Sequence, residues 1–159
     1  MKIVWILGIL VLIAALVSLS GALYFRRVAD DPTTWHVDPL TAVKPGSPNA
    51  ALIRPQGGDA AAPVYPVTPQ ALAEALDEVA LAEMRTRRIA GEADALWATY
   101  VQRSALWGFP DYISVKVFAT NGGASYAAFS RARFGRSDLG VNARRLARWQ
   151  AALDVRLAP

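Results

Sequence analysis

The sequence predicts an α+β protein, with an N-terminal transmembrane helix followed by a four-stranded antiparallel sheet that carries two helices on one face. A run of 23 residues without a charged side chain, Ile3–Phe25, predicts the first helix. Four stretches with strand character follow one another between residues 84 and 134, and a helical repeat flanks them on each side. We therefore expect an anchor over residues 1–27, a Pro-rich stalk over 28–67 packed partly on the domain, and a small α+β domain over 68–159.

The composition limits the chemistry that this chain can perform. The length of 159 residues predicts one domain, and the net charge of +4 comes almost entirely from arginine. The absence of cysteine excludes disulfides, thiol catalysis and thiolate metal sites. A zinc site usually needs three or four ligands, and His36 is the only histidine. We therefore predict no metal and no cofactor.

The apolar run is long enough to cross a bilayer, since at about 1.5 Å per residue it exceeds a hydrocarbon core of about 30 Å. Lys2 precedes it and Arg26 and Arg27 follow it. A cleavable signal peptide, cut after Ser18-Leu19-Ser20, is the alternative. The apolar run continues past that point to Phe25, which favours a retained anchor over a usual signal peptide.

Small residues at four-residue spacing, Ala14, Ser18 and Ala22, predict a shallow helix-packing groove for an integral membrane partner. The alternative is that small residues simply fill a lipid-facing helix. The flanking charges are balanced, and the short N-terminal segment favours a cytoplasmic N-terminus with an exported domain.

The stalk is defined by proline. Eight of the ten prolines lie between Pro32 and Pro69, which predicts linker or extended chain instead of helix. The portion Trp35–Pro39 is more apolar, so we expect it to lie against the domain. His36, next to Trp35, is interpreted as a packing residue rather than a catalytic one.

The domain is predicted to begin with a helix that Thr68 caps and Pro69 opens. Strands are then expected over Met84–Ala90, Leu96–Arg103, Tyr112–Ala119 and Ser125–Phe134. The first of these carries several arginines, which suits a sheet edge. Asn121-Gly122-Gly123 predicts a tight hairpin between the last two strands.

A last helix is predicted over residues 141–156, with Trp149 at the centre of its apolar stripe. This stripe predicts that Trp149 is buried against the sheet. Arg144, Arg145 and Arg148 are expected on the solvent side of the helix.

Residues 131–156 hold seven arginines against two acids, Asp138 and Asp154. Arg131 and Arg133 are two apart and so share one face of their strand. With Lys116 and Arg136 they form a predicted anion- or partner-binding patch on an open sheet face. The alternative is structural: Asp138 or Asp111 pairs with these cations, Asp138 caps the last helix, and the remaining arginines solvate a surface.

The run Phe134-Gly135-Arg136-Ser137-Asp138-Leu139-Gly140-Val141-Asn142 resembles the signature of a family named domain of unknown function 1499. Two earlier segments, Gly46-Ser47-Pro48-Asn49 and Gly108-Phe109-Pro110-Asp111, resemble its other motifs. In this resemblance Ser137, Asp138, Gly140 and Asn142 form a structural motif. A cysteine common after the early Pro-Asn pair is replaced by Ala50. The resemblance implies a bacterial or plastid protein in a membrane or exported setting, and it implies no activity.

No G-x-S-x-G, P-loop or paired-carboxylate pattern is present, so we expect a non-enzymatic protein. The first hypothesis is an accessory, assembly or stabilising subunit of a bacterial membrane protein complex, acting by protein–protein interaction. The alternative is a domain that binds an anionic ligand or lipid headgroup at the membrane surface. The expected location is the bacterial inner membrane, with a single pass and a periplasmic domain, and a membrane tether disfavours nucleic acid as partner.

Overall fold

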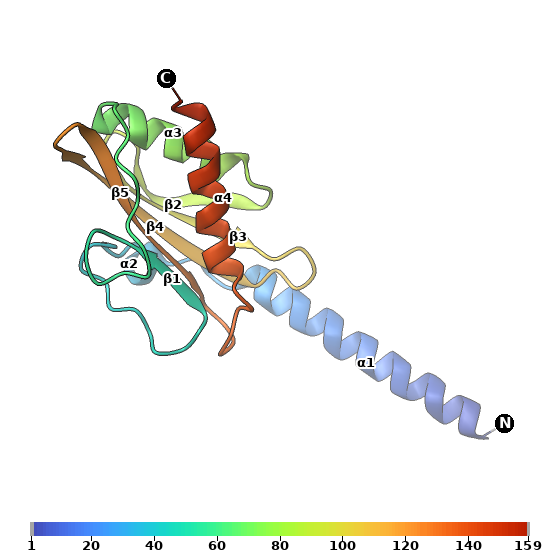
Figure 1. Ribbon diagram of the computed structural model, residues 1–159. Coiled ribbons are helices and arrows are strands. Elements are labelled where there is room, and N and C mark those ends of the chain that lie inside the picture. The colour runs from blue at the N-terminus through green and yellow to red at the C-terminus, as the bar shows by residue number, and fades with distance from the viewer. Residues whose placement is uncertain (1, 159) are drawn as a thin grey trace.

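The computed structural model describes residues 2–158. Helix α1 (Lys2–Arg27) projects from one end of the folded domain (Figure 1). It is long and apolar enough to cross a membrane, and its side chains are exposed along most of its length. The chain then enters the domain through a single helical turn, α2 (Pro32–Trp35), which Asp31 caps by accepting the Thr33 N–H.

The sheet has five antiparallel strands in the order β1-β5-β4-β3-β2. Their bounds are Ala50–Ile53 (β1), Thr86–Glu92 (β2), Trp97–Arg103 (β3), Pro110–Thr120 (β4) and Gly123–Ala132 (β5). The expectation of four strands was therefore wrong. The four predicted strands form the meander β2 to β5, and β1, from the segment assigned to the stalk, adds to the free edge of β5.

Local sequence explains the meander. The turn Asn121-Gly122 joins β4 to β5, and Thr120 pairs with Gly123 directly behind it, as expected for a two-residue hairpin. The arginine-bearing strand β2 lies at the sheet edge, also as predicted. Alternation in β4 places Ile113 and Val115 in the core beneath the helices.

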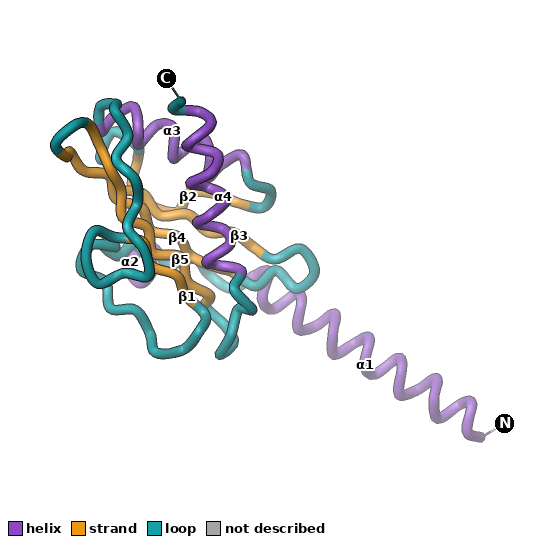
Figure 2. Tube along the Cα trace, in the orientation of Figure 1, coloured by secondary structure: helices purple, strands orange, loops and turns teal. Residues whose placement is uncertain are grey.

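Helices α3 (Pro69–Ala82) and α4 (Val141–Arg156) cover one face of the sheet (Figures 1 and 2). Thr68 caps α3 by accepting the Ala71 N–H at 3.2 Å, and Pro69 occupies the first turn, which confirms the predicted start. Trp149 is 2% exposed and meets Tyr100 edge to face, with ring centroids 5.8 Å apart. The predicted burial of Trp149 is confirmed.

The second face of the sheet is covered by residues 28–38. Trp35 stacks on Tyr112 with ring centroids 3.9 Å apart, and His36 stacks on Trp97 at 4.0 Å. The predicted packing of residues 35–39 on the domain is thus present. The expectation of an open sheet face was wrong, because this segment buries the aromatic side chains that the sheet presents to it.

Candidate functional site

Three of the four cations of the predicted patch are engaged by the covering segment. Lys116 forms an ion pair with Asp38 at 2.5 Å. Arg131 donates to the Trp35 carbonyl at 2.8 Å, and Arg133 donates to the Ala29 carbonyl at 2.7 Å. The internal partners are therefore residues 29–38 and not Asp111 or Asp138, which the structural alternative predicts.

Arg131 is the most enclosed of the three. Its guanidinium lies between the rings of Trp35 and Phe129, 5.2 and 4.6 Å from their centroids, and the residue is 9% exposed. Burial lowers its pKa to about 10. Arg136, the fourth member, is exposed in the loop after β5. The four cations therefore do not form one exposed platform.

Asp30 fixes the segment between α1 and the sheet. Its carboxylate accepts hydrogen bonds from Arg103 at 2.7 Å, Arg87 at 2.5 Å and the Tyr112 hydroxyl at 2.8 Å. Burial alone would raise the pKa of Asp30, but the hydrogen bonds from Arg103 and Tyr112 outweigh it and hold the pKa below its usual range. One buried carboxylate thus holds two arginines of the sheet.

The family-like motifs meet at the end of the domain where α1 joins it. Asn49 donates to the Gly135 carbonyl, and Asn142, fully buried, donates to the Asn49 carbonyl and to Asp138. Asp138 also accepts the N–H groups of Gly140, the N-cap residue of α4, and of Asn142 in the first turn, so its carboxylate satisfies free N–H groups at the start of the helix. Gly140 has φ of +77°, a left-handed conformation that glycine adopts without strain. Ser137 accepts the Leu139 N–H within the same turn.

Arg145 connects these motifs. It donates to Asp111 at 2.8 Å, to Gln102 at 2.6 Å and to the Asn142 side chain at 2.5 Å, and it is 2% exposed. The expected solvent position of Arg145 was wrong, because its position on α4 faces the end of the sheet, where Asp111 and Gln102 point toward it. Burial raises the pKa of Asp111, and the ion pair with Arg145 offsets this only in part.

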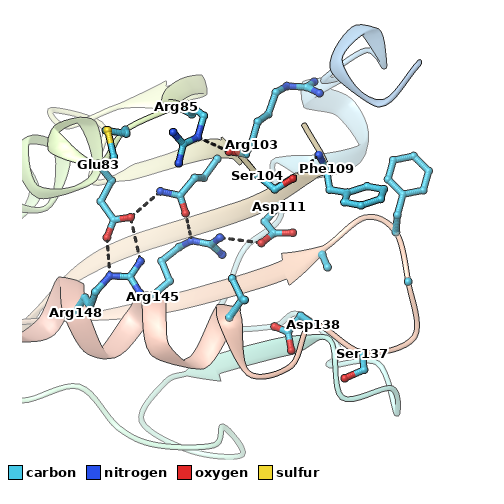
Figure 3. Close-up of a pocket in the computed structure, with 16 residues that line it drawn as sticks. Glu83, Arg85, Arg103, Ser104, Phe109, Asp111, Ser137, Asp138, Arg145 and Arg148 are labelled. Atoms are coloured by element: carbon cyan, nitrogen blue, oxygen red, sulfur yellow. Dashed lines mark hydrogen bonds and ion pairs between the residues drawn. The ribbon is translucent and has the colours of Figure 1, made fainter. Parts of the chain in front are cut away.

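A cavity of about 460 Å³ opens beside this network, between α4, the segment that follows α3 and the strand ends (Figure 3). Its polar wall carries Glu83, Arg85, Gln102, Arg103, Ser104, Asp111, Ser137, Asp138, Arg145 and Arg148. Its apolar wall carries Met84, Phe109, Ala132, Phe134 and Val141. In Figure 3 Arg145 and Arg148 rise from α4 toward Glu83 and Asp111, which neutralise them.

A second cavity of about 290 Å³ adjoins the first and shares Arg85, Arg103 and Ser104 with it. Four arginines line this second cavity: Arg26, Arg85, Arg87 and Arg103. We call the two cavities together the junction groove, because α1 meets the domain there.

The charges around the second cavity do not balance. Asp30 is the ion-pair partner of both Arg87 and Arg103. Arg26 and Arg85 donate only to backbone carbonyls, those of Ala105, Leu106 and Arg103, and within residues 2–158 neither forms an ion pair. Arg87 and Arg103 thus share the carboxylate of Asp30, and the described residues that line the second cavity include four arginines and no acidic residue.

The groove contains serine side chains, and the histidine of the described chain lies elsewhere. Ser104 and Ser137 line it, but His36 lies on the opposite face of the sheet, with its Nδ1 2.9 Å from the Thr99 hydroxyl. No cluster of three His, Cys, Asp or Glu side chains capable of holding a metal occurs within residues 2–158. The groove therefore combines arginine side chains with an adjoining apolar wall.

The predicted helix-packing groove of α1 stands apart from this site. Ala14 and Ser18 are exposed, and Ala22 is half-buried near the junction. The structure therefore leaves most of this stripe on the surface of the helix.

Sequence reasoning missed most residues of the junction groove. The sequence presents Arg26 only as a flank of the membrane span, and Arg85, Arg87 and Arg103 only as cations of strands. The family-like motifs were the available signal, because Asp111 belongs to Gly108-Phe109-Pro110-Asp111 and Ser137 and Asp138 belong to the run at residues 134–142.

The fold and site define a class: a small α+β domain joined to one apolar helix, with an arginine-lined groove at the junction. The chain belongs to the family described as "Protein of unknown function (DUF1499)", whose model matches residues 40–153. No curated protein and no solved structure matches the chain. The match runs from residue 40 to residue 153 within α4, so it does not include α1, which supplies Arg26 to the second cavity, or Asp30, which pairs with Arg87 and Arg103.

Proposed function

We propose that this protein is a membrane-anchored binding module that holds a phosphate-bearing amphiphile, of the kind represented by anionic lipids, in the junction groove. The observation that supports this most directly is the pair Arg26 and Arg85, two guanidinium groups without a carboxylate partner among residues 2–158, in a cavity that continues into an apolar wall. Guanidinium groups bind phosphate through paired hydrogen bonds, which makes phosphate a better fit than a single carboxylate.

The position of the groove supports a ligand from the bilayer. Arg26 belongs to the last turn of α1, directly after the apolar run, and it lines the second cavity. If α1 crosses the membrane, this turn lies at the headgroup level, where lipid phosphates are located. Phe109, Phe134 and Met84 then offer an apolar surface beside the phosphate site.

In this proposal α1 is an uncleaved anchor in the bacterial inner membrane, with the domain on the periplasmic side. Retention is expected because the apolar run continues past Ser20 to Phe25. The domain is attached just after this run, where Arg103 donates to the Phe25 carbonyl at 2.5 Å and to the Val28 carbonyl at 2.8 Å. Cleavage after Ser20 would leave Phe25 and Arg26 on a short free end. The intact mass of the mature protein distinguishes retention from cleavage, since a mature chain that starts at Gly21 would lack most of the anchor.

Binding is tested by titrating short-chain phosphatidic acid into the full chain in a nonionic detergent, with calorimetric detection. Arg85→Gln removes one charged donor, worth about 1.5–3 kcal/mol, so the affinity falls by roughly tenfold or more. Arg144→Gln is the matched control, because Arg144 is also exposed and also donates to one backbone carbonyl, but lies outside the groove.

The titration compares the two variants with the wild type and two further ligands with phosphatidic acid. Wild type and Arg144→Gln are expected to bind equally, and inorganic phosphate is expected to bind more weakly than phosphatidic acid because it does not reach the apolar wall. Short-chain phosphatidylcholine, whose net charge is zero, is expected to bind least. Equal losses in both variants, or no binding by wild type, would contradict the proposal.

An accessory or assembly subunit of a membrane complex is the second candidate. The observation in its favour is that Ala14 and Ser18, which form the small-residue stripe of α1, are exposed and so accessible to another helix. Co-purification from mild detergent tests it. Ala14→Leu with Ser18→Leu should release a helix partner, whereas Ser20→Leu, an exposed position on the opposite face of the same helix, should not.

A further inference from the structure

The loop between β3 and β4, residues 104–109, is fixed to the last turns of α1. The Arg26 guanidinium donates to the carbonyls of Ala105 and Leu106 at 3.0 and 3.1 Å. Gly108, with φ of +73°, lies so close to Arg26 that a side chain at this position would collide with it. We call residues 104–109 the junction loop; it lies beside the end of α1 in Figure 1.

Aromatic packing sets how far the junction loop reaches along α1. Phe25 contacts Phe109, with ring centroids 4.3 Å apart. The Trp107 ring reaches further toward the N-terminus and packs over Gly21, where the methyl group of an alanine would lie 3.2 Å from it. Gly21 precedes Phe25, the last residue of the apolar run, by four residues, or about 6 Å of helix.

Because Trp107 packs over Gly21, near the end of the apolar run, the tip of the loop lies at the boundary between headgroups and hydrocarbon if α1 crosses the bilayer. The run Ile3–Phe25 spans about 34 Å as a helix and the hydrocarbon core about 30 Å, so the end of the run marks that boundary. Tryptophan favours this zone because its ring is amphipathic. Leu106, at the tip, is 75% exposed in the chain alone, although it is apolar.

We propose that the junction loop inserts Leu106 and Trp107 into the bilayer leaflet that α1 leaves, and so fixes the orientation of the domain on the membrane. The proposal depends on α1 crossing the bilayer, but it does not depend on a ligand in the junction groove. The bilayer is the occupant that the contacts favour, because the loop is attached to the membrane-spanning helix itself and lies within its apolar length. Arg26 and Arg27, just beyond the loop tip, are then at the level of the phosphates.

The absence of native cysteine allows a single nitroxide label at a chosen position in the full chain. Leu106→Cys carries the label at the loop tip, and Val155→Cys is the matched control: its side chain is 81% exposed, at the end of the domain far from α1 (Figure 1). Val11→Cys reports the interior of the span. The chains are reconstituted into vesicles of phosphatidylcholine and phosphatidylglycerol, and accessibility to oxygen and to a water-soluble nickel complex is measured by electron paramagnetic resonance.

The Leu106→Cys label is expected to be accessible to oxygen and protected from nickel, with a depth between those of the labels at Val11 and Val155. A label at Leu106 as accessible to nickel as that at Val155 would overturn the proposal. Protection from both reagents would also overturn it, because the tip would then contact protein instead of lipid. A nickel-accessible label at Val11 would remove the membrane span on which the proposal depends.

Discussion

Asp30→Asn should loosen the attachment of α1 to the domain. Within residues 2–158 the Asp30 carboxylate is the ion-pair partner of both Arg87 and Arg103, and the substitution removes its charge. The Asp30 side chain is 3% exposed and Arg103 is 18% exposed, whereas Arg87 is 60% exposed. The ion pair between Asp30 and Arg103 therefore contributes more to the free energy of unfolding than the pair between Asp30 and Arg87. Removing one partner of a buried pair costs about 3–5 kcal/mol, and an exposed pair contributes about 0–1 kcal/mol.

The amide of asparagine retains one acceptor oxygen, and Arg103 also donates to the carbonyls of Phe25 and Val28. We therefore place the loss in unfolding free energy at about 2–4 kcal/mol, below the fully buried limit. For a chain of this size the melting temperature should fall by roughly 5–15 °C. Circular dichroism of the full chain in detergent, during thermal and urea unfolding, measures both quantities.

Asp31→Asn is the matched control. Asp31 is exposed and its side chain accepts only local bonds from Thr33 and Thr34, and asparagine caps a helix as well as aspartate does. Its melting temperature should equal that of the wild type. If Asp30→Asn also melts like the wild type, the assigned role of Asp30 is refuted. Asp30→Asn should in addition bind phosphatidic acid more tightly per folded molecule, because Arg87 and Arg103, which line the second cavity, lose their carboxylate partner.

Three further predictions concern other parts of the molecule. Trp149→Ala should lower the free energy of unfolding by about 3–5 kcal/mol, while Trp149→Phe should cost far less, since the buried indole N–H has no hydrogen-bond partner in the described chain; urea unfolding of both variants checks this. Burial lowers the pKa of His36, so the unfolded chain binds a proton at a higher pH than the folded chain does. The free energy of unfolding should therefore decrease from about pH 7 toward pH 5.5. Urea unfolding at each pH measures this decrease, and His36→Gln should remove the part that His36 causes. Gly108→Ala should strain the left-handed backbone and displace Arg26, which faster proteolysis at residues 104–109 would reveal; an unchanged cleavage rate would contradict the packing of the junction.

The parts of the fold governed by local sequence were predictable. Thr68-Pro69 identified the start of α3, the periodicity of α4 identified Trp149 as a core residue, and Asn121-Gly122 identified the β4–β5 hairpin. Strand β1 was missed because its four residues lie between Pro48 and Pro55, where proline favours linker, and because a strand this short shows no alternation.

The contacts that form the candidate site join residues far apart in the sequence, so no local sequence pattern predicts them. Arg131 meets Trp35 and Arg133 meets Ala29 across about a hundred residues of chain, so their apparent surplus of charge is satisfied by a segment that the sequence assigns to a stalk. The junction groove likewise combines the end of α1 with strand ends far along the chain. The apolar side chains of Trp35 and Val37 nevertheless predicted that part of the stalk packs on the domain, because their exposure to water is unfavourable.

The central claim, a phosphate site at Arg26 and Arg85, is tested most directly by a structure of the full chain with short-chain phosphatidic acid. The claim predicts phosphate oxygens within hydrogen-bond distance of both guanidinium groups and an acyl chain along Phe109 and Phe134. A phosphate bound only at exposed cations outside the groove, such as Arg136 or Arg144, or a groove that stays empty at saturating ligand, would contradict it.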